Sequence, residues 1–145
     1  MSGSDVRPVS IFKFTVNFGG ENINFQEAIL PESEIEVIEY RDGSDASSSV
    51  RKFPGLTKYS NLILKRGLTR SQDVYEWFKQ TKQGHLERRD ITISVLNEKK
   101  EHLAVWNLKN CWPTKYSGSP LKAKNSEVAI ETLEVATEDV DLEIK

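Results

Sequence analysis

The feature that most limits the fold of this chain is a two-residue alternation of apolar and polar side chains. The apolar members of its clearest segments are Phe12, Phe14, Val16 and Phe18, then Ile91, Ile93 and Val95, and finally Val140, Leu142 and Ile144. Successive side chains of a β-strand point to opposite faces, so this period indicates strands with one buried face. The sequence therefore predicts a mainly antiparallel β fold that extends to a final strand.

Several interruptions of this alternation predict where strands bend or stop. The apolar phase changes between Val37 and Ile38, and again between Ile130 and Leu133, which predicts a β-bulge at each place. A strand is expected from Leu56 to about Leu68, after a break at Pro54 and Gly55. Pro113 is expected either to end another strand or to place the end of that strand at a sheet edge, and a loop is expected from Lys115 to Asn125.

One segment has helical periodicity instead. Val74, Trp77 and Phe78 are spaced i, i+3 and i+4, which places them on one face of a helix. Thr69 could cap its start with Gln72 at the capping-box position, and Gly84 could end it with a positive φ. We therefore predict one α-helix at about 70–83.

The length of 145 residues fits a single domain. We predict two packed antiparallel sheets that form a small β-barrel with the helix on its flank. Within this domain we expect an N-terminal arm at residues 1–11, a mobile polar loop at 42–49 and an acidic terminal segment at 139–145.

The formal net charge of −2 hides a strong segregation of charge along the chain. Residues 1–50 carry a net charge of −6, residues 51–89 of +7, residues 90–125 of +3 and residues 126–145 of −6. Blocks of opposite sign can cover solvated faces, and they also suit a protein that packs against copies of itself. The chain as a whole is not basic enough to favour nucleic acid as its partner.

The sequence contains no pattern that indicates an enzyme, a metal site or a cofactor site. His85 and His102 have no metal-ligand spacing with Cys111, which we expect to be a small buried or edge residue. Glu127, Glu131 and Glu134 are expected to belong to a solvated acidic face rather than to a catalytic set. Glycine-rich phosphate loops and nucleophile motifs are also absent from the sequence. We predict a non-enzymatic protein with no catalytic residues, no metal and no cofactor.

A second interpretation rests on basic residues that alternate with aromatic ones between Arg51 and Arg66. Such a surface can hold phosphates and stack bases. A monomeric β-barrel module that binds single-stranded nucleic acid is therefore the alternative hypothesis.

Several short strings, in their order and spacing, resemble one family over about Phe12 to Glu138. They are residues 36–41 (EVIEYR), 50–55 (VRKFPG), 57–59 (TKY), 64–69 (LKRGLT), 106–113 (WNLKNCWP), 115–118 (KYSG) and 127–131 (EVAIE). This set resembles the inner-tube proteins of contractile phage tails and of phage-tail-like bacterial injection systems.

The resemblance implies a structural subunit that assembles with itself. Six copies would form a ring with a continuous β lining, and rings would stack into a hollow tube that is driven through a target envelope and conducts DNA or protein cargo. The implied partners are a contractile sheath protein, baseplate and spike proteins and tube initiators, with no stable membrane anchoring. The expected subunit and ring interface comprises Arg41, Asp42, Gly43, Val50, Arg51, Lys52, Phe53, Pro54, Lys58, Tyr59, Lys65 and Arg66.

The start of the sequence has no apolar signal-peptide segment. A single cysteine fits a reducing compartment. We therefore expect assembly in the bacterial cytoplasm, followed by incorporation into a virion or an injection particle.

Overall fold

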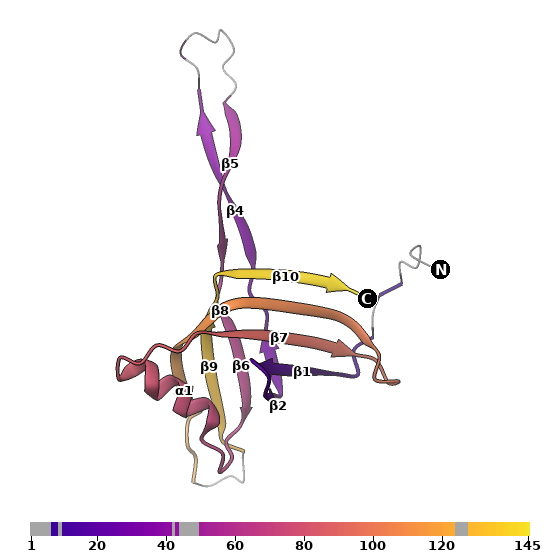
Figure 1. Ribbon diagram of the computed structural model, residues 1–145, viewed down its shortest axis with the longest axis vertical. Coiled ribbons are helices and arrows are strands. Elements are labelled where there is room, and N and C mark those ends of the chain that lie inside the picture. The colour runs from indigo at the N-terminus through magenta and orange to yellow at the C-terminus, as the bar shows by residue number, and fades with distance from the viewer. Residues whose placement is uncertain (1–6, 9, 42, 44–49, 124–127) are drawn as a thin grey trace.

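The computed structural model describes the chain except for residues 1–6, 9, 42, 44–49 and 124–127. In the described part the fold is mainly β with one α-helix, as predicted (Figure 1). The elements are β1 (Lys13–Phe18), β2 (Asn22–Ile23), β3 (Glu27–Ile29), β4 (Ser33–Tyr40), β5 (Arg51–Tyr59), β6 (Leu62–Gly67), α1 (Asp73–Lys82), β7 (Arg89–Leu96), β8 (His102–Gly118), β9 (Ile130–Ala136) and β10 (Asp139–Ile144).

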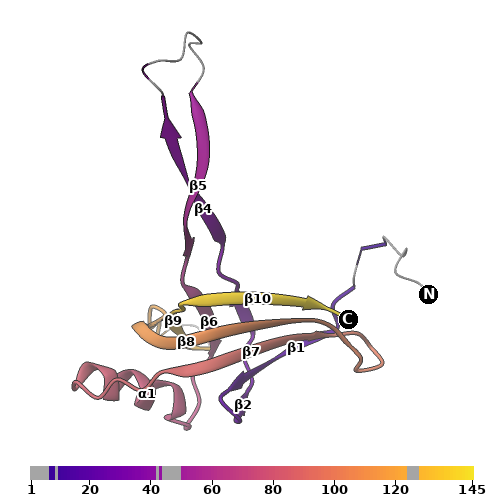
Figure 2. The same cartoon turned by 45° about the horizontal axis from the view of Figure 1, so that its top comes forward.

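Two antiparallel sheets share the long strand β8. The first sheet contains β2, β1, β7, the first part of β8 and, on the other edge of β8, β10. The second sheet runs from the last part of β8 through β9 and β6 to β3. A separate two-stranded hairpin, β4–β5, projects from this body (Figures 1 and 2).

Of the two possibilities predicted for Pro113, the end of its strand is wrong, whereas an edge position fits, because the last part of β8 pairs with β9 alone among the described strands. Strand β8 continues through Pro113 to Gly118, and its pairing shifts register between Pro113 and Lys115. Before this point β8 pairs with β7, and after it β8 pairs with β9. Proline is tolerated because the register irregularity removes the need for a regular ladder hydrogen bond there. Residues 115–118, expected to be loop, therefore belong to the strand that joins the two sheets.

The two packed sheets are confirmed, but the hydrogen-bonded path through the described strands does not close into a barrel. Its two ends are the short strands β2 and β3. These strands contribute only two and three residues, too few to complete a ladder between the sheets.

The core lies between the two sheets and under α1. The first sheet contributes Val16, Phe18, Ile91, Ile93 and Leu108, the second contributes Leu62, Leu64, Leu133 and Val135, and the helix contributes Val74 and Trp77. Cys111 is fully buried among them, in agreement with its predicted structural role. Burial of these side chains on both sheets is the main force that holds the body together.

The helix is shorter than predicted and begins differently. It spans Asp73–Lys82, and its N-cap residue, Gln72, makes no side-chain capping hydrogen bond. Thr69 does not cap it, because the Thr69 hydroxyl accepts a hydrogen bond from the Ser71 backbone N–H in the preceding turn. At the other end Gly84 has a φ of +92°, as its place beyond the helix predicts.

The segment from Val50 to Leu68 forms two strands whose break differs from the prediction. Pro54 and Gly55 lie inside β5, and the chain turns at Ser60 and Asn61. Each strand of a two-stranded hairpin has an unpaired edge, where a residue without an N–H costs little. The expected bulge in β4 is confirmed as a register shift between Ile35 and Val37.

The expected bulge between Ile130 and Leu133 is absent from the pairing of β9 with β6, which is continuous from Ile130 to Val135. Glu131 occupies the same buried face of β9 as Leu133 and Val135. The predicted loop at 42–49 and arm at 1–11 fall mostly outside the described residues. The acidic terminal segment forms β10, which confirms the expected final strand.

Candidate assembly surfaces

The β4–β5 hairpin is a long two-stranded ribbon with little burial. Every residue of β4 is exposed, and in β5 only Gly55 and Tyr59 are partly covered. Large apolar side chains are nevertheless frequent on it: Ile35, Val37, Ile38, Tyr40, Phe53 and Leu56, of which Leu56 is 73% exposed. A cluster of exposed apolar side chains on a projecting element is typical of a protein–protein contact surface.

Local cross-strand pairs explain why these residues form a hairpin. The ring of Tyr40 packs edge-on against that of Phe53, with 6.5 Å between centroids. On the polar positions, Lys58 lies 3.8 Å from Glu36. Gly55 allows a close approach, since a Cβ there would lie 3.1 Å from the Ile38 side chain. Such pairs stabilise antiparallel strands even without a third strand.

At the base of the hairpin, side-chain hydrogen bonds join it to the body at Tyr59 and join its two chain ends at Ser60. The Tyr59 hydroxyl donates to a carboxylate oxygen of Asp139 on β10 at 2.9 Å. This hydrogen bond is the main cause that raises the pKa of Tyr59 above its ordinary value. The Glu32 backbone N–H donates to the Ser60 hydroxyl at 2.7 Å. These contacts fix where the hairpin leaves the body.

Most of the predicted interface residues lie on this hairpin. Val50 precedes β5, which carries Arg51, Lys52, Phe53, Pro54, Lys58 and Tyr59, while Arg41 follows β4 and Gly43 lies beyond it. All of these are exposed except Tyr59, which is partly buried. Asp42 lies outside the described residues.

Lys65 and Arg66 are in a different place, on β6 within the second sheet. Lys65 is half-buried, and Arg66 is only 7% exposed. The expectation that Arg66 presents a charge to a neighbouring subunit does not fit this position, because its guanidinium is already used inside the fold.

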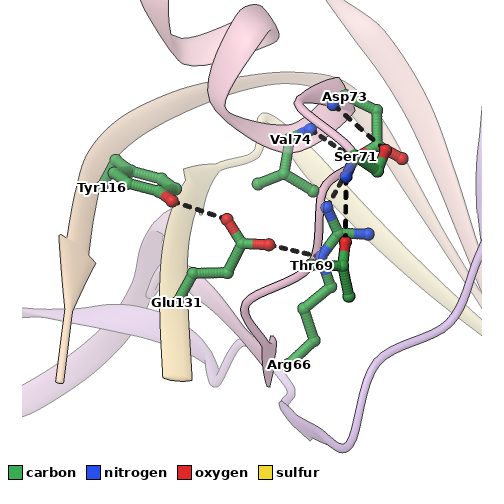
Figure 3. Close-up of polar contacts among 7 residues, drawn as sticks. All are labelled: Arg66, Thr69, Ser71, Asp73, Val74, Tyr116 and Glu131. Atoms are coloured by element: carbon green, nitrogen blue, oxygen red, sulfur yellow. Dashed lines mark hydrogen bonds and ion pairs between the residues drawn. The ribbon is translucent and has the colours of Figure 1, made fainter. Parts of the chain in front are cut away.

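Arg66 is the centre of a buried polar cluster that joins three strands and the helix (Figure 3). Its Nε donates to Glu131 on β9 at 2.5 Å, and its Nη2 donates to Asp73 at the start of α1. The second carboxylate oxygen of Glu131 accepts a hydrogen bond from the Tyr116 hydroxyl of β8 at 2.6 Å. Asp73 also accepts the backbone N–H of Val74.

Burial and pairing set the ionisation of this cluster. Burial acts to raise the pKa of Asp73, but the hydrogen bonds from Arg66 and from the Val74 N–H outweigh it and lower that pKa. Burial acts to lower the pKa of Arg66, and its hydrogen bonds to Asp73 and Glu131 raise it. Burial, followed by the hydrogen bond to Glu131, raises the pKa of Tyr116 to about 12. Arg66 and Asp73 are therefore charged and Tyr116 is neutral at neutral pH.

Sequence reasoning placed Glu131 on a solvated acidic face, and this is wrong. Glu131 is 3% exposed, whereas Glu134 is partly buried and Glu127 lies outside the described residues. One signal was available: Glu131 is in phase with Leu133 and Val135. A glutamate at such a position is compatible with burial when an arginine faces it.

The first sheet has two open edges in the described part of the chain. Strand β10 pairs only with β8. On the opposite side β1 pairs with β2 through Val16 and Asn17 alone, so that the outer edge of Lys13–Thr15 has no strand beside it. Unpaired strand edges offer backbone groups to another chain.

The described part of the chain has neither a metal-binding cluster nor a membrane-spanning helix. In this part of the chain no three His, Cys, Asp or Glu side chains gather closely enough to hold a metal ion. No helix found there has both the length and the apolar character needed to cross a membrane.

The model of the T4-like virus tail tube protein gp19 family matches residues 10–141. The chain belongs to this tail tube family. It is thus a structural tube protein of a phage-tail-like contractile system, as the sequence resemblance implied. The alternative of a monomeric nucleic-acid-binding module finds no support in this assignment.

Similarity to solved structures supports the assignment of the chain to the tail tube family. A chain of the PVC sheath–tube complex of an extracellular contractile injection system, in the extended state, is 26% identical, with a TM-score of 0.86. That match covers 100% of this chain and 99% of the other. A chain of the anti-feeding prophage tube-terminating cap is 27% identical, with a TM-score of 0.86, and the match covers 100% and 97% of the two chains.

The fold is also shared with more distantly similar proteins. Hcp1 from Flavobacterium johnsoniae is 14% identical, with a TM-score of 0.58, over 90% of this chain and 94% of that one. At this identity the match shows a shared fold alone. A search of curated protein sequences gave no match.

Proposed function

We propose that this tail tube protein forms hexameric rings that stack into the hollow inner tube of a contractile injection machine. The tube would be driven through a target envelope and would conduct DNA or protein cargo. The observation that carries this proposal is the projecting β4–β5 hairpin, whose apolar side chains are exposed in the single subunit. A second copy of the chain would cover them.

The open edges of the first sheet support closure into a ring. Three successive antiparallel pairings separate β1 from β10, so the two edge strands run in opposite directions. A rotation about a ring axis would place β1 of one copy beside β10 of the next in antiparallel orientation. The closed barrel that the subunit lacks would then be formed between subunits, as a continuous β lining.

The hairpin residues of the predicted interface fit contacts between rings. Phe53 and Ile38 are opposite each other on one face, whereas Glu39 and Lys52 form the neighbouring pair on the other face. The hairpin can thus present apolar and ionic contacts on opposite faces. Arg66 is left out of this interface because its partners are Asp73 and Glu131.

The partners follow from the same role. One relative is part of a sheath–tube complex, and another is part of a tube-terminating cap. We therefore propose that the outside of the tube contacts a contractile sheath and that its ends meet baseplate, spike, initiator and terminator proteins. Assembly in the bacterial cytoplasm and incorporation into a phage or injection particle belong to the same proposal.

The direct test is the oligomeric state of the purified full-length chain. Sedimentation should show a species near six times the subunit mass, and electron microscopy should show rings that stack at high concentration. A preparation that remains monomeric at micromolar concentrations, with and without a tube initiator, would contradict the proposed function.

Hairpin variants test the role of the projecting element. The double substitution Ile38→Ser, Phe53→Ser should leave the body folded and rings present, while stacked tubes are lost. The matched control Glu39→Ser, Lys52→Ser changes the cross-strand pair on the opposite face and should leave more stacking intact. Equal tube lengths for the apolar variant and the wild type, measured by electron microscopy, would exclude these side chains from the contact.

A further inference from the structure

The apolar face of the first sheet continues beyond the core that covers it. Cross-strand partners point to the same face of a sheet. One row across the four main strands is Phe14, Val95, Ala104 and Ile144, and the next row is Val16, Ile93, Trp106 and Leu142. Leu142 and Ile144 therefore point in the same direction as the core residues Val16 and Ile93.

Exposure rises along this face toward the end of β10. Val16 and Ile93 are 0% and 2% exposed, but Leu142 is 46% and Ile144 is 77% exposed. Phe14 and Ala104 are half-buried at the same end of the sheet. In both views this end of β1, β7, β8 and β10 extends away from β6, β9 and α1 (Figures 1 and 2). The second sheet and the helix thus stop short of it.

The outer part of β10 is exposed on both faces, but only one of them carries apolar side chains. Asp141 and Glu143 alternate with Leu142 and Ile144 and point to the opposite face, where Asp141 is the partner of Asn107. Leu142 and Ile144 are exposed to water beside an open strand edge. Their apolar surface is therefore available for burial by a neighbouring element.

We propose that Phe14, Ala104, Leu142 and Ile144, here called the seam face, are covered by a second copy of this chain within one ring. This inference rests on the proposed function and adds a surface to it. The seam face adjoins the open edge of β10, so a copy whose β1 pairs with that edge would also bring its own body over these side chains. The hairpin would then serve contacts between rings, and the two surfaces would separate ring closure from stacking.

The experiment compares two double variants of the same strand. Leu142→Ser, Ile144→Ser removes the apolar side chains of the seam face, and Asp141→Ser, Glu143→Ser makes the same change on the opposite face. The seam variant should raise the protein concentration needed for rings at least about tenfold, equivalent to ~1.4 kcal/mol. The control variant should form rings at the wild-type concentration. Sedimentation velocity and electron microscopy measure both.

Further comparisons distinguish a failure of the seam proposal from a failure of the proposed function. The hairpin variant Ile38→Ser, Phe53→Ser should still form rings, unlike the seam variant. Rings of the seam variant at wild-type concentration, while the wild type forms them, would overturn the seam proposal and leave the proposed function intact. A large drop in the melting temperature of the seam variant monomer would also overturn it, because it would show that the chain itself covers this face. Absence of rings in the wild type would instead contradict the proposed function.

Discussion

At the scale of single residues, Arg66 shows why a basic side chain in this chain is not necessarily part of its surface. It lies on β6, where its neighbours Leu64 and Leu62 are fully buried on the same face. It remains charged there because the carboxylates of Asp73 and Glu131 accept hydrogen bonds from its guanidinium. The cluster joins the start of α1 to β6, β8 and β9, so it fixes the helix relative to the second sheet.

The Arg66–Glu131 pair predicts a large effect of removing one partner. Glu131→Gln should lower the free energy of unfolding by up to about 3 kcal/mol, because the buried guanidinium of Arg66 keeps Asp73 but loses the other carboxylate that faces it. The double variant Arg66→Met, Glu131→Leu should lose less unfolding free energy than the sum of the losses in its two single variants. Urea unfolding of the variants in a double-mutant cycle measures this coupling. Strictly additive losses would show that the pair does not act as a unit.

Asp73 predicts how acid affects stability. Its pKa is lower in the folded protein than in the unfolded chain, so the folded state releases this proton more readily. The stability it contributes is then fully present above the unfolded pKa of about 4 and is lost as the pH falls through the folded pKa. The wild type should exceed Asp73→Asn in urea midpoint at pH 6, and the difference should shrink below about pH 4. A difference independent of pH would contradict this cause.

At the scale of elements, the helix α1 and the strand β8 were predicted with the correct secondary structure but with the wrong boundaries. The helix begins three residues later than predicted, because the Thr69–Ser71 turn and the Arg66–Asp73 contact define its start. Strand β8 runs through a proline because it changes partners there. The helix boundary is thus set by contacts of the preceding turn, and the extent of β8 by pairing with the more distant strand β9.

The seating of α1 can be tested at Trp77. This side chain is 2% exposed, its ring lies 5.4 Å from that of Phe18, and its Nε1–H donates to the Glu87 carbonyl. Trp77→Ala should cost about 3–5 kcal/mol of unfolding free energy, as for a large side chain removed from a packed core. Glu76→Ala, on the exposed side of the same turn, should change it by less than about 0.5 kcal/mol. Equilibrium unfolding that gives equal losses would place Trp77 outside the core.

At the scale of the whole molecule, the projecting hairpin and the two open sheet edges make the single subunit look incomplete. Several of its exposed apolar side chains lie on the hairpin, at the end of β10 and near the first residues of β1. A ring that repeats one contact around an axis removes such edges without a second type of subunit.

We expect charge to contribute to assembly at this scale, and the basic positions of the hairpin provide the test. Arg51→Glu, Lys52→Glu should shorten tubes without unfolding the subunit, since both side chains are exposed. An exposed ion pair contributes only ~0.2–1 kcal/mol and is screened by salt. The effect should therefore be modest and should diminish at high salt, measured as tube length by electron microscopy. Unchanged lengths at low and high salt would mean that these charges only keep the surface soluble.

The sequence by itself determined the class of fold, the helix near Val74 and the family. Alternation of apolar side chains is a local property, because it depends only on the geometry of a strand and on one face being buried. The helical stripe of Val74 and Trp77 and the terminal strand Val140–Ile144 could be predicted for the same reason. The motifs that carry the family resemblance are short stretches of sequence, so they could also be identified without the structure.

The tertiary structure alone decided which polar residues are buried and which apolar residues are exposed. Glu131 has the sequence appearance of a surface residue, and its burial depends on Arg66, 65 residues away. Ile144 has the appearance of a core residue, and its exposure depends on where the second sheet ends. Burial is a property of what packs against a strand, and that partner is chosen by long-range pairing, which a local pattern does not encode.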